Sequence, residues 1–338
     1  MSPSPAAMRA ILFERTGGPE VLRLGEQPVP VPGAGEVLIR VAATALNLAD
    51  VRQRQGAYIM SSGPRVLGLE CSGTIAALGD GVLGWTVGQP VCALLGKGGY
   101  AEYATAHQSQ LLAVPDGLDL ADAAAMPEAA ATIWSNIFDL GGLQPGGILL
   151  VHGGAGGIGS LALQFGRALG ARVFCTASAT RRAFCESLGA ERSFDYRDET
   201  AAAAFLAATD GHGADVILDN MGASHLAQNI ECLALDGRIM SIGLQGGRVA
   251  EINLAALMKK RGSLCSTSLS DRSPAAKARI MAGVRMQLWP HVASRAVRPV
   301  IDRSFALADA AEAHRAMEAG GRAGKLLLRV ASATPGQS

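Results

Sequence analysis

The stretch from Gly147 to Arg182 constrains the fold of this chain more than any other part of its sequence, which reads GILLVHGGAGGIGSLALQFGRALGARVFCTASATRR there. The apolar run 148–151 is short enough for a strand that is buried on both faces. A glycine turn follows, then a helical pattern over 160–169 and a second apolar run over 173–176. This order of strand, turn, helix and strand predicts a βαβ unit of the kind that binds dinucleotides.

The glycine turn fits the pattern G-x-G-x-x-G, with Gly154, Gly156 and Gly159 at its three glycine positions. In such a unit the first glycine permits the tight turn, the second lets the backbone approach a pyrophosphate, and the third lets the helix pack closely. We expect the first amides of the helix, which include those of Gly157 and Ile158, to face outward without partners at the positive end of the helix dipole. The turn therefore predicts an anion site.

The residues after the second predicted strand indicate which dinucleotide binds. NAD sites usually place Asp or Glu about 20 residues past the glycines, where the carboxylate bonds the ribose 2′-hydroxyl. Here that position falls in 176–178, which holds no acid, and Ser178 is followed by Arg181 and Arg182. A hydroxyl and a guanidinium stabilise a 2′-phosphate, so the sequence favours NADPH over NADH. In the alternative interpretation, the two arginines only open the next helix on a solvated face.

Length and composition place the chain among globular proteins with more than one core. Its 338 residues exceed the size of one small domain, and 49% hydrophobic against 17% charged residues exclude a disordered chain. A net charge of +1 and an aromatic content of 4% disfavour a protein that binds nucleic acid.

The sequence contains no pattern that predicts export or membrane insertion. The first ten residues, MSPSPAAMRA, lack the apolar core of a signal peptide, and the most apolar region, 148–165, is interrupted by the glycine turn. The six cysteines form no C-x-x-C pair and lie mostly in apolar runs, which predicts buried free thiols in a reducing compartment. We therefore expect a cytoplasmic protein without a membrane partner.

The distribution of turn residues divides the chain into three stretches. Residues 1–128 contain short apolar segments separated by Gly and Pro, which predict a mostly β domain. Residues 129–269 alternate between strand and helix patterns, which predicts a doubly wound parallel sheet with helices on both faces. The segments of 270–338 have no place in that sheet, so we expect them to return to the first domain. The predicted fold class is α/β.

Several segments, in order along the chain, share a pattern with one known family. They are ALNLADVRQRQGAY (45–58), LGLECSG (67–73), GGYAEYATAH (98–107), AAAMPEAAATIW (123–134), VHGGAGGIG (151–159), LGAERSFDYR (188–197), ECLALDGRIMSIGLQGG (231–247), KKRGSLCSTSL (259–269) and AHRAMEAGGRAGKLLL (313–328). Together they resemble the zinc-independent quinone oxidoreductase branch of the medium-chain dehydrogenase/reductase superfamily, and most of all its tumour-suppressor-inducible NADPH type. The resemblance implies a discontinuous GroES-like catalytic domain, a Rossmann domain that binds NADPH, and a homodimer.

Zinc-dependent relatives in this superfamily carry a cysteine and a His-Glu pair in the first domain. The matching positions here hold Asn47 and the pair Leu69-Glu70, and the four closely spaced cysteines of the structural zinc lobe are missing. The resemblance thus implies no metal site. Without a Lewis acid an isolated carbonyl is poorly polarised, so we expect an acceptor that is itself electrophilic, such as a quinone or an enone.

The resemblance also gives three catalytic candidates. Asn47 and Tyr58 match polar positions at the nicotinamide site of the family, where each can donate a hydrogen bond to a developing oxyanion, and Tyr58 can also donate a proton. The structural alternatives are Asn47 in a turn and Tyr58 as a half-buried surface aromatic. Asp50 either orients Asn47 or caps the helix that begins there.

The predicted cofactor-binding residues combine the glycine turn with positions taken from the resemblance. They are Thr132, Gly154, Gly156, Gly157, Ile158, Gly159, Ser178, Arg181, Tyr196, Gly243, Leu244, Ser268, Leu269 and Lys325. Thr132 is alternatively a residue of a helix interior, and Tyr196 a core aromatic. Gly243 and Leu244 are expected near the nicotinamide, because ligands of such sheets bind beyond the carboxyl ends of strands. His152, just before the turn, fits a hydrogen-bonded structural histidine better than a catalytic base.

Three hypotheses for the function follow. The first is an NADPH-dependent reductase of quinones that transfers hydride directly, without metal or flavin. The second is a reductase of enones or enoyl thioesters, which uses the same hydride geometry on a different acceptor. The third is a nucleotide-sensing or RNA-binding protein on the same fold.

Overall fold

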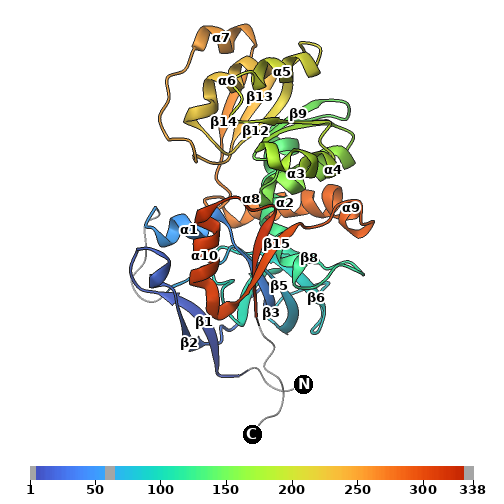
Figure 1. Cartoon of the computed structure of the whole chain (residues 1–338). Coiled ribbons are helices and arrows are strands. Elements are labelled where there is room, and N and C mark those ends of the chain that lie inside the picture. Colours follow the sequence, from blue (N-terminus) through green and yellow to red (C-terminus); the bar gives the residue numbers. More distant parts are fainter. Residues whose placement is uncertain (1–4, 58–64, 331–338) are drawn as a thin grey trace. The chain divides into compact units, whose positions relative to one another are not determined.

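The computed structural model describes residues 5–57 and 65–330 of the chain. The chain divides into two compact units, each shown with its elements in Figure 1. Unit 1 combines Met1–Glu128 with Pro299–Ser338, and unit 2 is Ala129–Arg298. The predicted fold class, a mostly β GroES-like domain with a Rossmann domain, is confirmed.

Unit 1 contains two sheets. The smaller has the order β2-β1-β4, and the larger has the order β15-β16-β3-β5-β6-β8, with β7 paired to β3 as well. The strands are β1 (Ala7–Phe13), β2 (Arg23–Pro28), β3 (Glu36–Ala45), β4 (Arg65–Val66), β5 (Glu70–Leu78), β6 (Pro90–Leu94), β7 (Tyr103–His107), β8 (Leu111–Ala113), β15 (Ile301–Ala306) and β16 (Lys325–Arg329). All pairs are antiparallel except the parallel pair β15 and β16.

The C-terminal segment belongs to unit 1 because its apolar residues complete the core there. Leu326 and Leu328 on β16 are fully buried against the same cluster as Val37 and Ile39 on β3. Helix α10 (Ala310–Ala319) adds Ala313 to that cluster. β16 pairs with β3 over Leu327↔Ala45 to Arg329↔Ala43, so it lies beside the residues that lead into helix α1 (Leu48–Arg54). Residues 299–330, part of the segment expected to return to the first domain, lie in unit 1.

Unit 2 contains one parallel sheet with the order β11-β10-β9-β12-β13-β14. Its strands are β9 (Ile148–His152), β10 (Arg172–Ala177), β11 (Arg192–Asp195), β12 (Ala214–Asp219), β13 (Leu233–Ser241) and β14 (Ser263–Ser266). Its helices are α3 (Gly157–Ala168), α4 (Arg182–Ser187), α5 (Ala201–Ala208), α6 (Leu226–Cys232), α7 (Leu254–Lys259), α8 (Pro274–Gly283) and α9 (Trp289–Ala293), while α2 (Pro127–Ile133) contains the boundary between the units. The strand order reverses between β10-β9 and β9-β12, which makes a switch point beyond the carboxyl end of β9.

Alternate residues of β9 pack on opposite faces of this sheet, as the pleat requires. Ile148 and Leu150 lie in a core cluster with Phe205 of α5. On the other face, α3 packs so closely that a Cβ on Gly166 would lie 2.8 Å from Val173 and 3.1 Å from Leu149. Both faces of β9 are therefore covered, which explains its uninterrupted apolar run.

The second domain boundary predicted from the sequence is wrong. The sequence pattern assigns residues 270–298 to the first domain, but α8, α9 and the π-helical segment Val284–Leu288 belong to unit 2. The reason is local: Ile280, Val284 and Leu288 are fully buried, and a Cβ on Gly283 would collide with Trp134. These residues cover a helix of unit 2 instead of extending its sheet, which the strand pattern alone cannot indicate.

No helix in the described part of the chain is long and apolar enough to cross a membrane. All six cysteines are free; five are buried and Cys265 is partly exposed.

Candidate dinucleotide site and active site

The glycine turn connects β9 to α3, as the sequence predicts. Gly156 precedes the helix in an extended conformation (φ −74°, ψ 177°), and no side chain caps the first turn. The left-handed residue of the turn is Gly153, with φ +70°, which the sequence pattern did not identify. A residue with a Cβ is strained in that conformation. The backbone of the turn therefore requires glycine at position 153, and not at position 154.

Two of the three motif glycines leave no room for a side chain. A Cβ on Gly154 would lie 2.6 Å from Cys175 Sγ, and a Cβ on Gly159 would collide with the carbonyl oxygen of Gly153. Among the described residues, a Cβ on Gly156 would approach only that same carbonyl oxygen, at 3.3 Å. The turn is thus closed toward the protein and open at Gly156, where the amides of Gly157 and Ile158 begin α3. These features fit a bound pyrophosphate.

The residues predicted to determine the preference for NADPH over NADH follow β10 and β11, which are neighbouring parallel strands. Ser178 comes directly after β10, and Arg181 ends the short 3-10 turn before α4. Tyr196 follows β11; it is 48% exposed, and the Arg197 guanidinium lies over its ring at 5.2 Å from the centroid. The carboxyl ends of parallel strands share one edge of the sheet, so the fold brings these side chains to the same edge as the glycine turn.

The structure also places an acid at this edge that the sequence count did not find. Asp195 is the register partner of Ala177, because β11 lies parallel to β10. Its carboxylate accepts the amide N–H of Ala179 at 3.1 Å and that of Arg197 at 3.0 Å. A count of residues from the glycine turn looks for an acid at the end of β10. Asp195 lies instead at the end of the neighbouring strand β11. The carboxylate is engaged by two backbone amides, which partly offset its charge.

Gly243 and Leu244 follow β13 and lie against the end of β12. A Cβ on Gly243 would lie 2.7 Å from the carbonyl oxygen of Asn220, and Leu244 is 41% exposed. The side-chain amide of Asn220 faces the turn as well, since its Nδ2 would lie 2.9 Å from a Cβ on Gly153. Its Oδ1 is buried without a partner in the described residues. This position at the switch point is the one in which such sheets bind a nucleotide, and sequence reasoning missed Asn220.

The remaining predicted cofactor residues of unit 2 are connected by hydrogen bonds. Thr132 is buried in α2, and its carbonyl oxygen accepts Asn136 Nδ2 at 2.8 Å. Asn136 Oδ1 accepts the Thr267 hydroxyl at 2.6 Å, directly beside Ser268 and Leu269. The segment after β14 is therefore fixed to the helix that holds Thr132.

His152 is a structural residue, as the sequence favoured. Its Nε2 lies 2.6 Å from Asn229 Oδ1 and its Nδ1 lies 3.0 Å from the Thr176 hydroxyl. Burial lowers the pKa of His152 to about 4, so the ring is neutral at physiological pH. A neutral ring with both nitrogens bonded has no free site for base catalysis.

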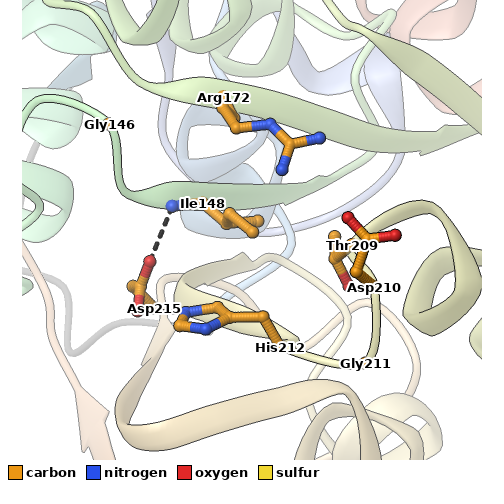
Figure 2. Close-up of a pocket in the computed structure, with 8 residues that line it drawn as sticks. All are labelled: Gly146, Ile148, Arg172, Thr209, Asp210, Gly211, His212 and Asp215. Atoms are coloured by element: carbon orange, nitrogen blue, oxygen red, sulfur yellow. Dashed lines mark hydrogen bonds and ion pairs between the residues drawn. The ribbon is translucent and has the colours of Figure 1, made fainter.

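A surface pocket of about 640 Å³ lies at the opposite edge of the sheet in unit 2 (Figure 2). It opens at Ile148 and Arg172, the first residues of β9 and β10, whereas the glycine turn follows the last residue of β9. Both carboxylate oxygens of Asp215 already have partners in this pocket: one accepts the backbone N–H of Ile148 at 2.7 Å, and the other lies 3.0 Å from His212 Nε2. These bonds fix the start of β9, and the pocket is separate from the dinucleotide site.

Unit 1 contains a buried polar cluster around Asn47, the N-cap residue of α1. Lys325, the first residue of β16, donates from Nζ to Asn47 Oδ1 and to Glu70 Oε1, the latter at 2.6 Å. Asn47 Nδ2 donates to the same Glu70 oxygen at 2.8 Å. Asn47, Glu70 and Lys325 are 7%, 0% and 4% exposed, so the ion pair is nearly cut off from water. The other Glu70 oxygen accepts the Glu128 amide at 2.9 Å.

Asp50 both orients Asn47 and caps α1. Its Oδ2 accepts a hydrogen bond from the backbone N–H of Asn47 at 2.9 Å, and its Oδ1 accepts one from the backbone N–H of Gly68 at 3.0 Å. Asp50 is fully buried, and this burial raises its pKa to about 7 against the opposing effects of the two amides and of Lys325. The carboxyl group therefore changes its charge near neutral pH.

The catalytic candidates thus separate into those the structure places and one it does not describe. Asn47 and Asp50 lie together in unit 1, whereas Tyr58 lies outside the described residues. Lys325, predicted with the cofactor residues, lies against Asn47 and Glu70 in unit 1. Sequence reasoning missed Glu70 as a partner of Asn47, although its place in the segment LGLECSG marked the position. The described residues contain no group of three or more His, Cys, Asp or Glu placed to hold a metal ion.

Comparison with known proteins assigns the family. Residues 33–116 match the family model described as the alcohol dehydrogenase GroES-like domain, and residues 188–328 match the one described as zinc-binding dehydrogenase. The quinone oxidoreductase of Pseudomonas aeruginosa is 32% identical, over 95% of this chain and 99% of that protein. The rat quinone oxidoreductase is 30% identical, over 97% and 99%. The chain belongs to the medium-chain dehydrogenase/reductase superfamily, and it is an oxidoreductase of the quinone oxidoreductase type.

Solved structures agree with this assignment. The quinone oxidoreductase of Pseudomonas syringae pv. Tomato has a TM-score of 0.86 at 31% identity, covering 95% of this chain and 99% of that one. The Escherichia coli quinone oxidoreductase complexed with NADPH has a TM-score of 0.85 at 26% identity, covering 95% and 99%. A protein described as NAD-dependent alcohol dehydrogenase has a TM-score of 0.87 at 30% identity, covering 96% and 100%.

One further relative has a different context. A phenolphthiocerol/phthiocerol polyketide synthase of Mycobacterium tuberculosis is 32% identical over 97% of this chain, and the match takes up 15% of that much longer protein. Proteins described as quinone oxidoreductases and as a polyketide synthase therefore share this degree of similarity to the chain.

Proposed function

We propose that the protein is an NADPH-dependent reductase that transfers hydride directly to quinones, without metal or flavin. The observation that carries the proposal is the hydrogen bonding of the Asn47 side chain, which occupies the position where zinc-dependent relatives have a ligand. Its side-chain oxygen is occupied by Lys325 and its nitrogen donates to Glu70. An amide held in this way is not available to a cation, and amide groups are not among the usual zinc ligands. An acceptor that needs no Lewis acid suits such a site.

The proposed preference for NADPH rests on the edge of the sheet formed by β10 and β11. Ser178 supplies a hydroxyl and Arg181 a guanidinium, which together stabilise a phosphate dianion on the ribose. Asp195 lies at the same edge, and its bonds to two backbone amides limit its repulsion of that phosphate. Two proteins of similar structure are described as complexes with NADPH, the Escherichia coli quinone oxidoreductase and a mycobacterial protein.

The amides at the start of α3 would bind the pyrophosphate, with Gly156 leaving room for it. When bound, the reduced nicotinamide supplies the hydride. The chain itself would stabilise the charge that develops on the acceptor oxygen. Asn47 donates one N–H to Glu70, and its second N–H makes only a long contact of 3.5 Å with the Ala45 carbonyl oxygen. That second N–H is held only by this long contact, so it can donate to an acceptor oxygen instead.

Lys325 increases the strength of this donor. Its ammonium group contacts Asn47 Oδ1, and a cation on an amide oxygen draws electron density away from the amide nitrogen. In a site this poor in water the polarisation of linked hydrogen bonds is stronger than in solution. The buried cation also favours any negative charge that forms near the amide.

An enone or enoyl-thioester reductase is the second candidate, because a polyketide synthase is as similar in sequence as the quinone oxidoreductases are. Steady-state rates with NADPH on naphthoquinone, phenanthrenequinone and 2-alkenals separate the two. The proposal expects the quinones to have the higher kcat/KM, unchanged after treatment with a chelator. Fast alkenal reduction with no quinone turnover would establish the second candidate instead.

We further propose that the protein forms a homodimer through the edge strand β14. This strand pairs with β13 on one side, and no other described strand pairs with its second side. Leu264 on β14 is 42% exposed, and on α7, the helix that precedes β14 in the chain, Leu254 and Met258 are 62% and 76% exposed. An unpaired strand edge can pair with another chain, and exposed apolar side chains mark interaction surfaces.

Light scattering of the purified protein tests the dimer. Leu264→Asp should convert a dimer to a monomer, whereas Val31→Asp, at an 87% exposed position of unit 1, should leave the mass unchanged. A monomeric wild-type protein at micromolar concentration would rule this proposal out.

A further inference from the structure

His152, the last residue of β9, connects the glycine turn to helix α6 through hydrogen bonds that the function proposed above does not use. Its Nδ1 lies 3.0 Å from the Thr176 hydroxyl on β10, and its Nε2 lies 2.6 Å from Asn229 Oδ1 on α6. His152, Thr176 and Asn229 are 4%, 7% and 0% exposed. All three belong to unit 2. Burying polar groups is costly unless they are hydrogen bonded, so each of these side chains depends on its partner.

The hydrogen-bond partners of His152 determine where its single ring proton lies. The oxygen of an amide side chain can only accept, so His152 Nε2 carries the proton and donates it to Asn229 Oδ1. The ring is neutral, because burial lowers the pKa of His152 to about 4, so Nδ1 carries no proton and must accept. The Thr176 hydroxyl therefore donates its only proton to His152 Nδ1.

Because the proton of the Thr176 hydroxyl is directed at His152, the oxygen can accept from the glycine turn. The backbone N–H of Gly153 donates to this oxygen across a long contact of 3.4 Å. The next backbone N–H, that of Gly154, donates to the Thr176 carbonyl oxygen at 2.9 Å. One residue of β10 thus accepts from two successive amides of the turn. A hydroxyl proton that pointed at Gly153 instead would repel its N–H.

The peptide group of Gly153 controls the part of the turn that is open. Gly153 has the left-handed conformation, with φ +70°. Its carbonyl oxygen accepts the backbone N–H of Gly156 at 2.9 Å, so the orientation of Gly153 sets the position of Gly156. Gly156 is the residue at which the backbone leaves room for a pyrophosphate. The room at Gly156 therefore depends on how firmly Thr176 holds the N–H of Gly153.

We propose that His152 is a positioning residue of the dinucleotide site: by accepting the Thr176 proton at Nδ1, it makes the Thr176 hydroxyl an acceptor for Gly153 and so holds the turn in the form that receives a pyrophosphate. The inference rests on the proposed binding of NADPH at this turn. It assigns the contribution of His152 to one ring nitrogen, and not to the volume or the charge of the ring.

Two substitutions of His152 separate the two ring nitrogens. His152→Asn places an amide oxygen near the position of Nδ1, so it keeps an acceptor for Thr176 and loses the contact with Asn229. His152→Gln reaches the position of Nε2, so it keeps a donor for Asn229 and loses the acceptor for Thr176. If His152 only filled space, the longer glutamine would be the better replacement. The inference expects the opposite order.

Calorimetric titration with NADPH, in the absence of any acceptor, measures this order. The loss of one hydrogen bond corresponds to a change of about fivefold in affinity. The Kd for NADPH should therefore increase about fivefold in His152→Gln, and it should stay within about twofold of the wild-type value in His152→Asn. Thermal unfolding of both variants, measured in parallel, separates an effect on the fold from an effect on binding.

Variants of Thr176 test the same hydrogen bond from its other side. Thr176→Val removes the hydroxyl at nearly constant volume and should also weaken NADPH binding about fivefold, with no further loss when it is combined with His152→Gln. Thr176→Ser keeps the hydroxyl and should bind NADPH as the wild type does. The control is Thr209→Val, because the Thr209 hydroxyl accepts the Gly213 N–H at 3.2 Å beside the pocket at the opposite edge of the sheet. Its loss should leave the Kd unchanged.

NMR tests the direction of the hydrogen bonds without the cofactor. Long-range ¹H–¹⁵N spectra, with the His152 signal assigned through His152→Gln, should show the Nε2–H form of the ring at pH 7. The Nδ1–H form would overturn the inference, because the Thr176 hydroxyl would then accept from the ring. Equal Kd values for His152→Asn and His152→Gln, or additive losses in the double variant, would overturn it as well.

The failure of this inference can be told apart from the failure of the proposed function. If the wild-type protein binds NADPH but the His152 variants do not follow the expected order, only the inference fails. If the wild-type protein binds no NADPH in the titration, the proposed function fails, and the role of His152 at the site fails with it.

Discussion

The buried ion pair of Lys325 and Glu70 gives a prediction whose size follows from the structure. Lys325→Met removes the cation and leaves the Glu70 carboxylate, which is 0% exposed, without the charge that lies 2.6 Å from it. Removing one partner of a buried pair costs about 3–5 kcal/mol, because the remaining charge is uncompensated. For a unit of this size each kcal/mol lowers Tm by about 2–4 °C, so we expect a decrease of about 10 °C.

Differential scanning calorimetry at pH 8 measures this effect, with two comparison variants. Arg9→Met breaks an ion pair of the same unit at 2.7 Å whose partners are 50% and 19% exposed. Ion pairs that are screened by solvent contribute less than about 1 kcal/mol to the free energy of unfolding. The Tm of Arg9→Met should therefore fall by at most a few degrees. The double variant Lys325→Met with Glu70→Gln should recover most of the loss, because the new amide can donate to Asn47 and accept from the Glu128 amide. Equal costs for Lys325→Met and Arg9→Met, or no recovery in the double variant, would refute the reasoning.

Three other predictions concern the cofactor and pH. Arg181→Glu should lower the NADPH preference over NADH by at least tenfold in kcat/KM, since a carboxylate repels the 2′-phosphate; indifference of the ratio would count against the proposed nucleotide edge. As the pH falls through about 7, Asp50 takes up a proton and kcat should decline on the acid side, so a flat profile from pH 6 to 8 would separate Asp50 from the reaction. Gly154→Ala places a Cβ 2.6 Å from Cys175 Sγ and should weaken NADPH binding in calorimetry by at least tenfold, whereas Gly96→Ala, where no described atom lies within 4 Å of the new Cβ, should bind normally.

The features that the sequence predicted correctly are set by local patterns. The turn at Gly154–Gly159 has its own glycine spacing, and the alternation of strand and helix after it gave the parallel sheet of unit 2. In that sheet, Ser178 and Tyr196 follow neighbouring parallel strands, whose carboxyl ends share one edge. These inferences needed no contact between distant parts of the chain.

The features that were missed depend on such contacts. The ion pair of Glu70 and Lys325 joins residues 255 positions apart, and the pairing of β3 with both β5 and β16 brings them together beside Asn47. Asp195 reaches the nucleotide edge from a neighbouring strand, which a count along one strand cannot reveal. The helices of 270–298 were assigned to the wrong unit because a helical pattern does not indicate what it packs against.

The most direct test of the proposed function is the oxidation of NADPH by the purified protein with phenanthrenequinone, followed by the loss of NADPH absorbance in the presence of a metal chelator. We predict turnover that persists with the chelator, that is faster with NADPH than with NADH, and that Asn47→Ala reduces about 100-fold. No quinone-dependent oxidation of NADPH, or activity that the chelator abolishes, would contradict the proposal.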